Sequence, residues 1–193
     1  LNAGFASSLA SLRLHAATPG FSQKDATLGI KESLAQGTRA AISRLGRPDG
    51  FLKDQAVRIL LPDSLKKLAD TARKLGAGKQ VDALELAMNR AAEKAVESAA
   101  DIFADAVREM SVKDALAIVR GGDDAGTQYF RRTTEKQLRE RFRPIVEGAT
   151  AETQLAKRYK SLSKKAGGLD VLLGGGEAVD LDGYVTEKAM DGL

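Results

Sequence analysis

The chain has 193 residues, of which 43% are hydrophobic and 29% charged, and its formal net charge is +4. These values are typical of a folded domain with a real core, and they exclude a disordered or membrane-embedded chain. Cysteine is absent and His15 is the only histidine, which argues against thiolate chemistry, histidine catalysis and a metal site. We therefore expect no metal, no resident cofactor and no membrane span.

The first helix is expected from residue 22 to residue 46. Ser22 with Asp25 resembles a capping box, in which a side chain satisfies the free N–H groups of a helix start. Apolar residues such as Ile30 and Leu34 then recur at helical spacing, and Gly46 can end the helix. Residues 1–21 before it are expected to form an N-terminal arm without an intact signal peptide, and residues 22–193 one helical domain.

A turn and a short extended segment are expected next. The Pro-Asp-Gly order in "RPDGF" is typical of a turn. In "AVRILLP" the apolar residues Val57, Ile59 and Leu61 alternate, which predicts an extended segment near residues 57–61. Pro62 can occupy the first position of the following helix, and Gly76 can end it.

The longest apolar stripe runs from residue 81 to residue 110 and contains many alanines, which predicts a slender, closely packed central helix. Ser98 with Asp101 can cap a new helix, so the stripe is expected to divide into two helices that meet near Glu97. Asn89 and Glu93 lie four residues apart and share one face. We expect Asn89 to bridge helices through hydrogen bonds.

Several helix ends are expected between residues 111 and 145. Ser111 with Asp114 predicts a helix start, and Gly121-Gly122 predicts its end. Asp123 or Asp124 can cap the next helix, which makes a cap more plausible there than a cation site. Thr134 with Gln137 predicts a third helix start, and Pro144 a kink or a restart. "GGDDAGTQYFRRTT" is thus interpreted as a helix junction, in which Tyr129 and Phe130 belong to the core.

A further helix is expected to end near Gly167, followed by a glycine-rich loop. A short closing helix is then capped by Asp180 or Asp182. The fold predicted by these patterns is all-α: a single-domain helical bundle of about seven to nine helices with one extended segment.

Arg131 and Arg132 raise the question of a binding site. Adjacent residues on a helix point about 100° apart, so one arginine should lie half-buried if Phe130 is buried. Such an arginine needs an anionic partner, either a carboxylate such as Asp123, Asp124, Glu93 or the acidic tail, or an anionic ligand. No catalytic residue is identified. The candidate ligand-binding residues are Arg131, Arg132, Asn89, Arg90, Asp123 and Asp124.

Charge is spread unevenly along the chain. Residues 121–165 carry 11 Lys and Arg against 6 Asp and Glu, whereas residues 166–193 carry one Lys against 6 acids. The two segments either neutralise one another or leave a basic patch for an acidic partner. Glu135 and Glu140 interrupt the basic face of Arg132, Lys136 and Arg139, so we expect no binding to nucleic acid.

Five stretches carry a family resemblance: "LGRPDGFL", "AVRILLPDSL", "MNRAAEKAV", "GGDDAGTQYFRRTT" and "DGYVTEKAMDGL". They resemble the signature blocks of the bacterial domain-of-unknown-function family 4197, from about Asp25 to Leu193. The resemblance implies an export signal, removed in the mature protein, and a place in the periplasm or cell envelope, and it implies no activity. It also implies a further amphipathic segment after Leu193.

The expected function is a binding or interaction module rather than an enzyme. Its partner would be an anionic small molecule, a lipid or a protein. One alternative is an enzyme that uses carboxylates and arginines on an anionic substrate, and another is a nucleic-acid-binding module.

Overall fold

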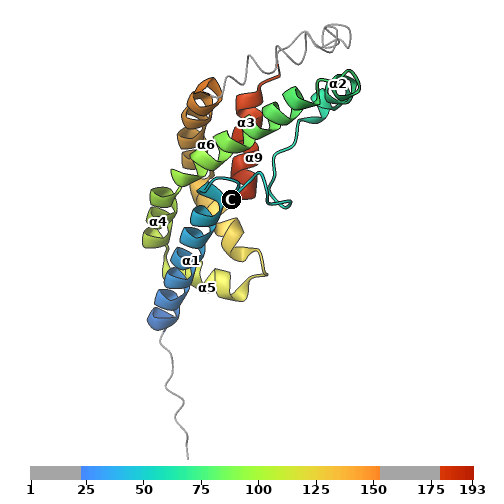
Figure 1. The fold of residues 1–193 in the computed structure, drawn as a ribbon. Coiled ribbons are helices and arrows are strands. Elements are labelled where there is room, and N and C mark those ends of the chain that lie inside the picture. The colour runs from blue at the N-terminus through green and yellow to red at the C-terminus, as the bar shows by residue number, and fades with distance from the viewer. Residues whose placement is uncertain (1–22, 153–178) are drawn as a thin grey trace, which may run out of the picture.

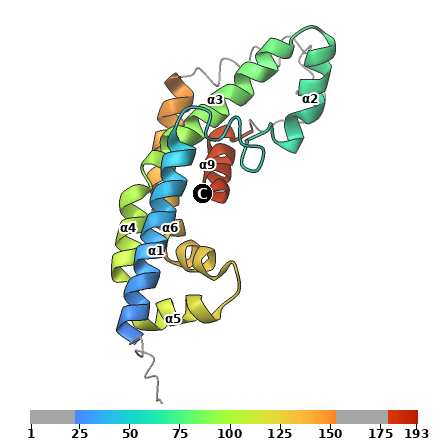
Figure 2. The same ribbon diagram turned by 60° about the horizontal axis from the view of Figure 1, so that its bottom comes forward.

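The computed structural model describes residues 23–152 and 179–193, and these residues form helices and connecting segments without a strand. The expected all-α helical bundle is confirmed. The bundle is elongated: α2 lies toward one end, α3 runs from there toward the middle, and α5 lies toward the other end (Figures 1 and 2). The seven helices of the described ranges are α1 (Gln23–Gly46), α2 (Asp63–Lys74), α3 (Gly78–Glu97), α4 (Ala100–Glu109), α5 (Val112–Arg120), α6 (Ala125–Glu152) and α9 (Leu181–Gly192).

Helix α3 is the centre of the core and packs against α1, α2, α6 and α9. Its alanines 87, 91, 92 and 95 are buried, and the larger Val81, Leu84 and Met88 are buried with them. Small side chains let neighbouring helix backbones approach closely, so one helix can contact four others. The prediction of a slender, closely packed central helix is confirmed.

The break between α3 and α4 falls at Ser98 and Ala99, close to the predicted junction at Glu97. The predicted cap is wrong. The Ser98 hydroxyl donates backwards to the carbonyl oxygen of Ala95 at 2.7 Å, and Ala99 precedes α4 without a side-chain cap. Serine inside a helix can satisfy its hydroxyl on the preceding turn, which removes it as an acceptor for the next helix.

Val57 belongs to a turn, and residues 58–61 form neither a helix nor a strand, so the predicted extended segment is not a strand. Ile59 and Leu61 are buried and Leu60 is exposed, so the predicted alternation is confirmed. Pro62 stands one position earlier than expected, as the residue before α2 rather than its first residue.

Helix α6 differs most from its prediction. The capping box of Ser111 and Asp114 at the start of α5 is present, and Gly121 follows the last residue of α5 as predicted. However, α6 continues through Thr134 and Pro144 without a new start. Thr134 is buried, and its hydroxyl donates to the carbonyl oxygen of Phe130 at 2.7 Å.

The reason for the continuous α6 is tertiary packing. Leu138, Phe142, Val146 and Ala149 form one buried stripe that spans the proline, while Pro144 itself faces solvent. Burial of that stripe stabilises the helix by more than the hydrogen bond that proline removes. Contacts with helices that are distant in sequence therefore outweighed the local signals for a helix start at Thr134 and a break at Pro144.

A smaller second core lies beside the main one and contains Met110, Ala115 and Tyr129, with Phe130 partly buried against it. The Tyr129 hydroxyl donates to the carbonyl oxygen of Ala106 at 2.7 Å, which ties α6 to α4. The predicted core position of Tyr129 is confirmed, whereas Phe130 packs against both cores but is only partly buried.

The closing helix α9 packs against α6 and α3. The Asp180 carboxylate accepts a hydrogen bond from the backbone N–H of Gly183 at 2.8 Å, which confirms Asp180 as its cap. The predicted helix that ends near Gly167 and the loop after it lie almost wholly outside the described residues.

Candidate functional site

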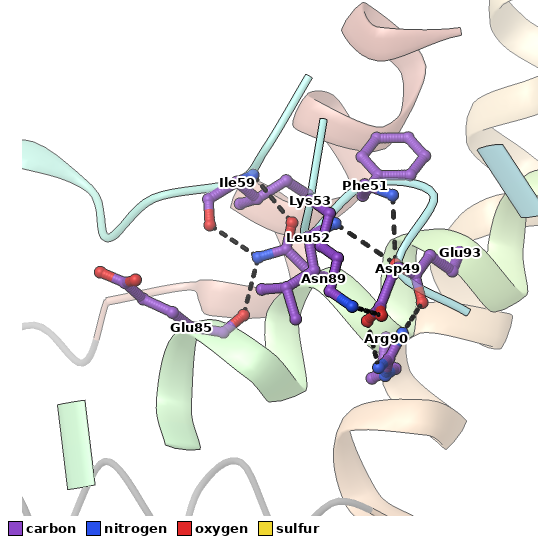
Figure 3. Close-up of polar contacts among 9 residues, drawn as sticks. All are labelled: Asp49, Phe51, Leu52, Lys53, Ile59, Glu85, Asn89, Arg90 and Glu93. Carbon is purple, nitrogen blue, oxygen red and sulfur yellow. Dashed lines mark hydrogen bonds and ion pairs between the residues drawn. The ribbon is translucent and has the colours of Figure 1, made fainter. Parts of the chain in front are cut away.

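A buried polar network joins α3 to the segment of residues 49–60 (Figure 3). Asn89 is 0% exposed; its Oδ1 accepts from the N–H of Ile59 at 2.9 Å, and its Nδ2 donates to the Ile59 carbonyl at 2.8 Å. The same Nδ2 also donates to the Glu85 carbonyl at 2.8 Å. Asn89 thus binds both backbone groups of Ile59, a residue outside the helices, rather than bridging two helices as expected.

Glu93 lies one turn further along α3 and is 3% exposed. Its Oε1 accepts from the N–H groups of Phe51 and Leu52 at 3.1 and 3.3 Å. Its Oε2 accepts from Arg90 Nη1 at 2.6 Å. A buried carboxylate needs both hydrogen bonds and a counter-charge, and Glu93 has both.

Arg90 completes the network at the protein surface. Its Nη2 donates to Asp49 Oδ1 at 2.6 Å, and Lys53 lies 2.7 Å from Asp49 Oδ2. Hydrogen bonds from Lys53 and then Arg90 lower the pKa of Asp49. The hydrogen bond to Glu93 is the largest cause of the raised pKa of Arg90. Both candidate ligand-binding residues of α3, Asn89 and Arg90, therefore have hydrogen-bond partners within the protein.

Asp49 was missed as a member of this network. Its φ is +70°, a left-handed conformation that aspartate tolerates better than most residues. The Pro-Asp-Gly turn signal located this residue, but nothing in the sequence linked it to an arginine 41 positions away.

The arginine pair of α6 lies at the surface. The side chains of Arg131 and Arg132 are 59% and 66% exposed, so the prediction that one of them is half-buried is wrong. Phe130, on which that prediction depended, is itself only partly buried, so α6 presents both arginines to solvent. Each lies 3.7 Å from an aspartate, Asp191 for Arg131 and Asp114 for Arg132.

Asp123 and Asp124 are exposed just before α6. The backbone carbonyl of Asp124 accepts from the N–H of Gln128 at 2.9 Å, and its carboxylate accepts from the Gln128 side chain at 3.2 Å. Within the described ranges no cluster of three or more potential ligands is placed to hold a metal ion. The six predicted site residues are thus distributed over the α3 network, the start of α6 and its middle, rather than gathered in one site.

A cavity of about 340 Å³ lies between α1, α4, α6 and α9, and Arg131 is one of its lining residues. Apolar side chains form much of its wall, and hydroxyl and charged side chains stand among them. The apolar lining residues are Ala41, Phe103, Phe130, Leu138, Met190 and Leu193; the polar ones are Thr38, Thr127, Arg131, Thr134, Glu135, Glu187 and Asp191. Phe103 and Phe130 pack edge to face, with ring centroids 4.9 Å apart.

The charges around this cavity balance. Arg139 contacts Glu187 and also lies 3.2 Å from Glu135. Asp191 lies between Arg131 at 3.7 Å and Lys188 at 3.6 Å. Three cations therefore face three carboxylates, and the basic α6 and the acidic α9 neutralise one another, which was one of the two interpretations of the uneven charge.

The carboxyl groups with displaced pKa values are ionised more readily than usual. The largest cause is a hydrogen bond in each case: from Lys53 to Asp49, from the N–H of Ala56 to Asp54, from Lys66 to Asp63 and from Ser111 to Asp114. A lowered pKa keeps a carboxylate charged and makes it a poor proton donor at neutral pH. These groups favour structure and binding over acid catalysis.

The chain was compared with known families, proteins and structures. A family model described as "Protein of unknown function (DUF4197)" matches residues 20–193. No curated protein and no solved structure matches. In the described part of the chain, every helix is too short or too polar to cross a membrane.

Proposed function

The chain belongs to the DUF4197 family, whose description gives no function, and we propose from the geometry that it is a binding module. Its site is the cavity between α1, α4, α6 and α9, which takes a small, mainly apolar molecule. The observation that carries this proposal is the cavity itself, about 340 Å³ with an apolar wall. Small-molecule sites typically have volumes of about 300–1,000 Å³, apolar walls and a few polar groups.

Some apolar side chains of the cavity wall are still partly exposed to solvent, so a ligand can bury more of their surface. Phe130, Met190 and Leu193 stay partly exposed at the edge of the cavity. A ligand that covers apolar surface gains about 25 cal/mol for each Å² removed from water.

The wall is also held in place before any ligand arrives. The hydrogen bond from Tyr129 to Ala106 fixes α6 against α4. The contact between Arg139 and Glu187 joins α6 to α9. Because the ligand does not have to order these helices, less of its binding free energy is lost to conformational entropy.

The alternative of an enzyme finds no supporting observation among the described residues. The hydroxyls of Thr38 and Thr134 in the cavity donate to backbone carbonyls one turn earlier, those of Leu34 and Phe130. A nucleophilic hydroxyl needs a neighbouring base to take its proton, and neither has one as a hydrogen-bond partner.

The proposal is tested by titrating the protein with the uncharged apolar dye N-phenylnaphthylamine, whose fluorescence rises in apolar surroundings. Ala41 lines the cavity and Ala40 is an exposed neighbour on the same helix that does not. Ala41→Phe should fill the cavity and abolish dye binding, whereas Ala40→Phe should leave it unchanged. Absence of saturable binding to the wild type, or equal binding by both variants, would overturn the proposal.

We also propose that the protein acts in the bacterial periplasm or cell envelope. The support is the resemblance of its sequence blocks to a family whose members usually carry an export signal. Fractionation of the native host, with the N-terminus of the recovered protein determined, tests this location. Recovery from the cytosol with an intact leader would overturn it.

A further inference from the structure

We propose that the ligand of the cavity is an amphiphile with a single anionic head group, and that Arg131 binds this head group at the cavity rim. The inference rests on the proposed function, because it specifies the chemistry of a molecule whose apolar part occupies the same cavity. The structure supports it through hydrogen bonding, local charge and the position of Arg131 on α6.

Arg131 lines the cavity, and its guanidinium makes no hydrogen bond with any other described residue. Its nearest anion is Asp191 at 3.7 Å, beyond the length of an N–H···O hydrogen bond. A guanidinium has five N–H donors in a planar fork that fits a carboxylate, sulfonate or phosphate. Its side chain is 59% exposed, so its donors are available to a ligand without unfolding.

The three carboxylates that line the cavity, Glu135, Glu187 and Asp191, each have a cation beside them. Glu135 and Glu187 share Arg139, which contacts both of them. Asp191 is shared by two cations, Arg131 and Lys188 at 3.7 and 3.6 Å. Arg131 is the one cation among the four charged residues that line the cavity, and it shares its single carboxylate neighbour with Lys188, so its charge is only partly compensated.

The position of Arg131 on α6 combines a polar and an apolar contact. Thr127, Arg131, Thr134 and Leu138 recur every three or four residues and therefore lie on one face of the helix. All four line the cavity. A ligand along this face can place its apolar part against Leu138 while its head group lies beside Arg131, with Thr134 between them.

Arg132 is a matched control. It is the next residue of the same helix, its side chain is 66% exposed, and it too lies 3.7 Å from an aspartate, Asp114. It does not line the cavity, and its guanidinium lies over the ring of Tyr129, 5.8 Å from the centroid. A general loss of positive charge on α6 would affect both variants equally, whereas a head-group contact involves Arg131 alone.

The test is displacement of N-phenylnaphthylamine from the full chain at neutral pH by decanoate, decanol and decylamine. These molecules share one alkyl chain and differ in having an anionic, a neutral or a cationic head group. Decanoate should displace the dye at the lowest concentration. Arg131→Ala should weaken decanoate about fivefold, the effect of one exposed ionic contact, and leave decanol unchanged. Arg132→Ala should change neither.

Asp191→Asn provides an opposite test, because it removes the carboxylate that competes for Arg131. It should strengthen decanoate binding and leave decanol unchanged, a gain that damage to the fold would not produce. Salt at about 1 M should reduce the preference for decanoate, since exposed charges are screened at that concentration.

The possible failures separate the two proposals. Equal displacement by decanoate and decanol, a preference for decylamine, or an equal loss in both arginine variants would overturn the head-group inference while leaving an apolar site. Failure of the dye and of all three ligands to bind would overturn the proposed function and the inference together.

Discussion

The polar network on α3 and the rim of the cavity between α6 and α9 both contain arginines and carboxylates. These groups are hydrogen-bonded to one another in the network, whereas at the rim the Arg131 guanidinium is exposed and makes no hydrogen bond within the described residues. Glu93 is 4% exposed at its side chain and accepts hydrogen bonds of 2.6–3.3 Å from three donors. Arg131 is 59% exposed and has one ionic neighbour at 3.7 Å. The Glu93 carboxylate in the network has its hydrogen-bond partners within the protein, whereas the Arg131 guanidinium at the rim has N–H donors that are available to a ligand.

The difference shows that burial decides whether a polar group stabilises the fold or is available to a ligand. Removing a partner inside the network leaves a charge or a backbone N–H without water, which costs several kcal/mol. A rim group that loses its partner is hydrated instead, at little cost. We therefore expect substitutions in the network to affect stability, and substitutions at the rim to affect binding.

The largest effect on stability is expected for Glu93→Ala. The change leaves the N–H groups of Phe51 and Leu52 unpaired and deprives Arg90 of one of its two carboxylates. The free energy of unfolding, measured by urea denaturation, should fall by about 3–5 kcal/mol. Glu93→Gln keeps an acceptor for the backbone and should lose less. A loss below about 1 kcal/mol for the alanine variant would contradict a structural role.

Asn89→Ala should have the next largest effect. It leaves both backbone groups of Ile59 without their buried partner, at a cost of about 1–3 kcal/mol for each stranded group. Urea denaturation again provides the measurement, and Lys79→Ala, at an exposed position of the same helix, is the control. Equal stability of the two variants would show that the segment around Ile59 does not depend on Asn89.

Asp49→Asn should change the pH dependence of stability. Lys53 and Arg90 lower the pKa of Asp49 in the folded protein, so its contribution is present at neutral pH and is lost as the pH falls through the lowered pKa. Asparagine tolerates the left-handed φ of +70° at this position. The variant should melt below the wild type at pH 7, and the difference between the two melting temperatures should shrink as the pH falls below 3.8, the ordinary pKa of an aspartate. A constant difference across that range would exclude this ionic contribution.

Arg131→Ala and Arg132→Ala should scarcely change stability. Both ion pairs are exposed and 3.7 Å long, so each variant should lose under about 1 kcal/mol in thermal or urea denaturation. A loss of 3 kcal/mol or more in either variant would place that arginine with the structural network and would remove the contrast between the two regions.

Nucleic acid should show the smallest effect. The basic side chains of α6 have acidic neighbours, including Glu140 for Lys136 and Glu147 for Arg143. We expect only non-specific binding to duplex or single-stranded DNA, with a Kd of about 10⁻⁴–10⁻⁶ M at physiological salt. Submicromolar affinity with a steep salt dependence would mean that these pairs open for a phosphate backbone.

The sequence predicted those features that depend on neighbouring residues. The Ser111–Asp114 capping box, the Asp180 cap and the alternation around Ile59 were all found where the pattern placed them. Helix starts and alternating segments are encoded within a few positions of the chain. The same rules failed at Thr134, because the stripe of α6 packs against helices that are distant in sequence.

The candidate site could not be predicted in this way. Its wall combines residues of four helices, such as Ala41 of α1, Phe103 of α4 and Met190 of α9. No local pattern states which helix faces meet, and exposure of Arg131 depends on that packing. Two sequence features pointed toward this region: the arginine pair that contains Arg131, and the opposite charge of residues 121–165 and 166–193.

The central claim is that the cavity binds a ligand while the α3 network only supports the fold. The most direct measurement is a map of backbone amide chemical shifts with and without saturating N-phenylnaphthylamine. The account predicts that the largest changes fall at residues lining the cavity, such as Phe103, Phe130 and Met190, and that Asn89 and Glu93 are little affected. Changes centred on Asn89 and Glu93, or the absence of any localised change, would contradict it.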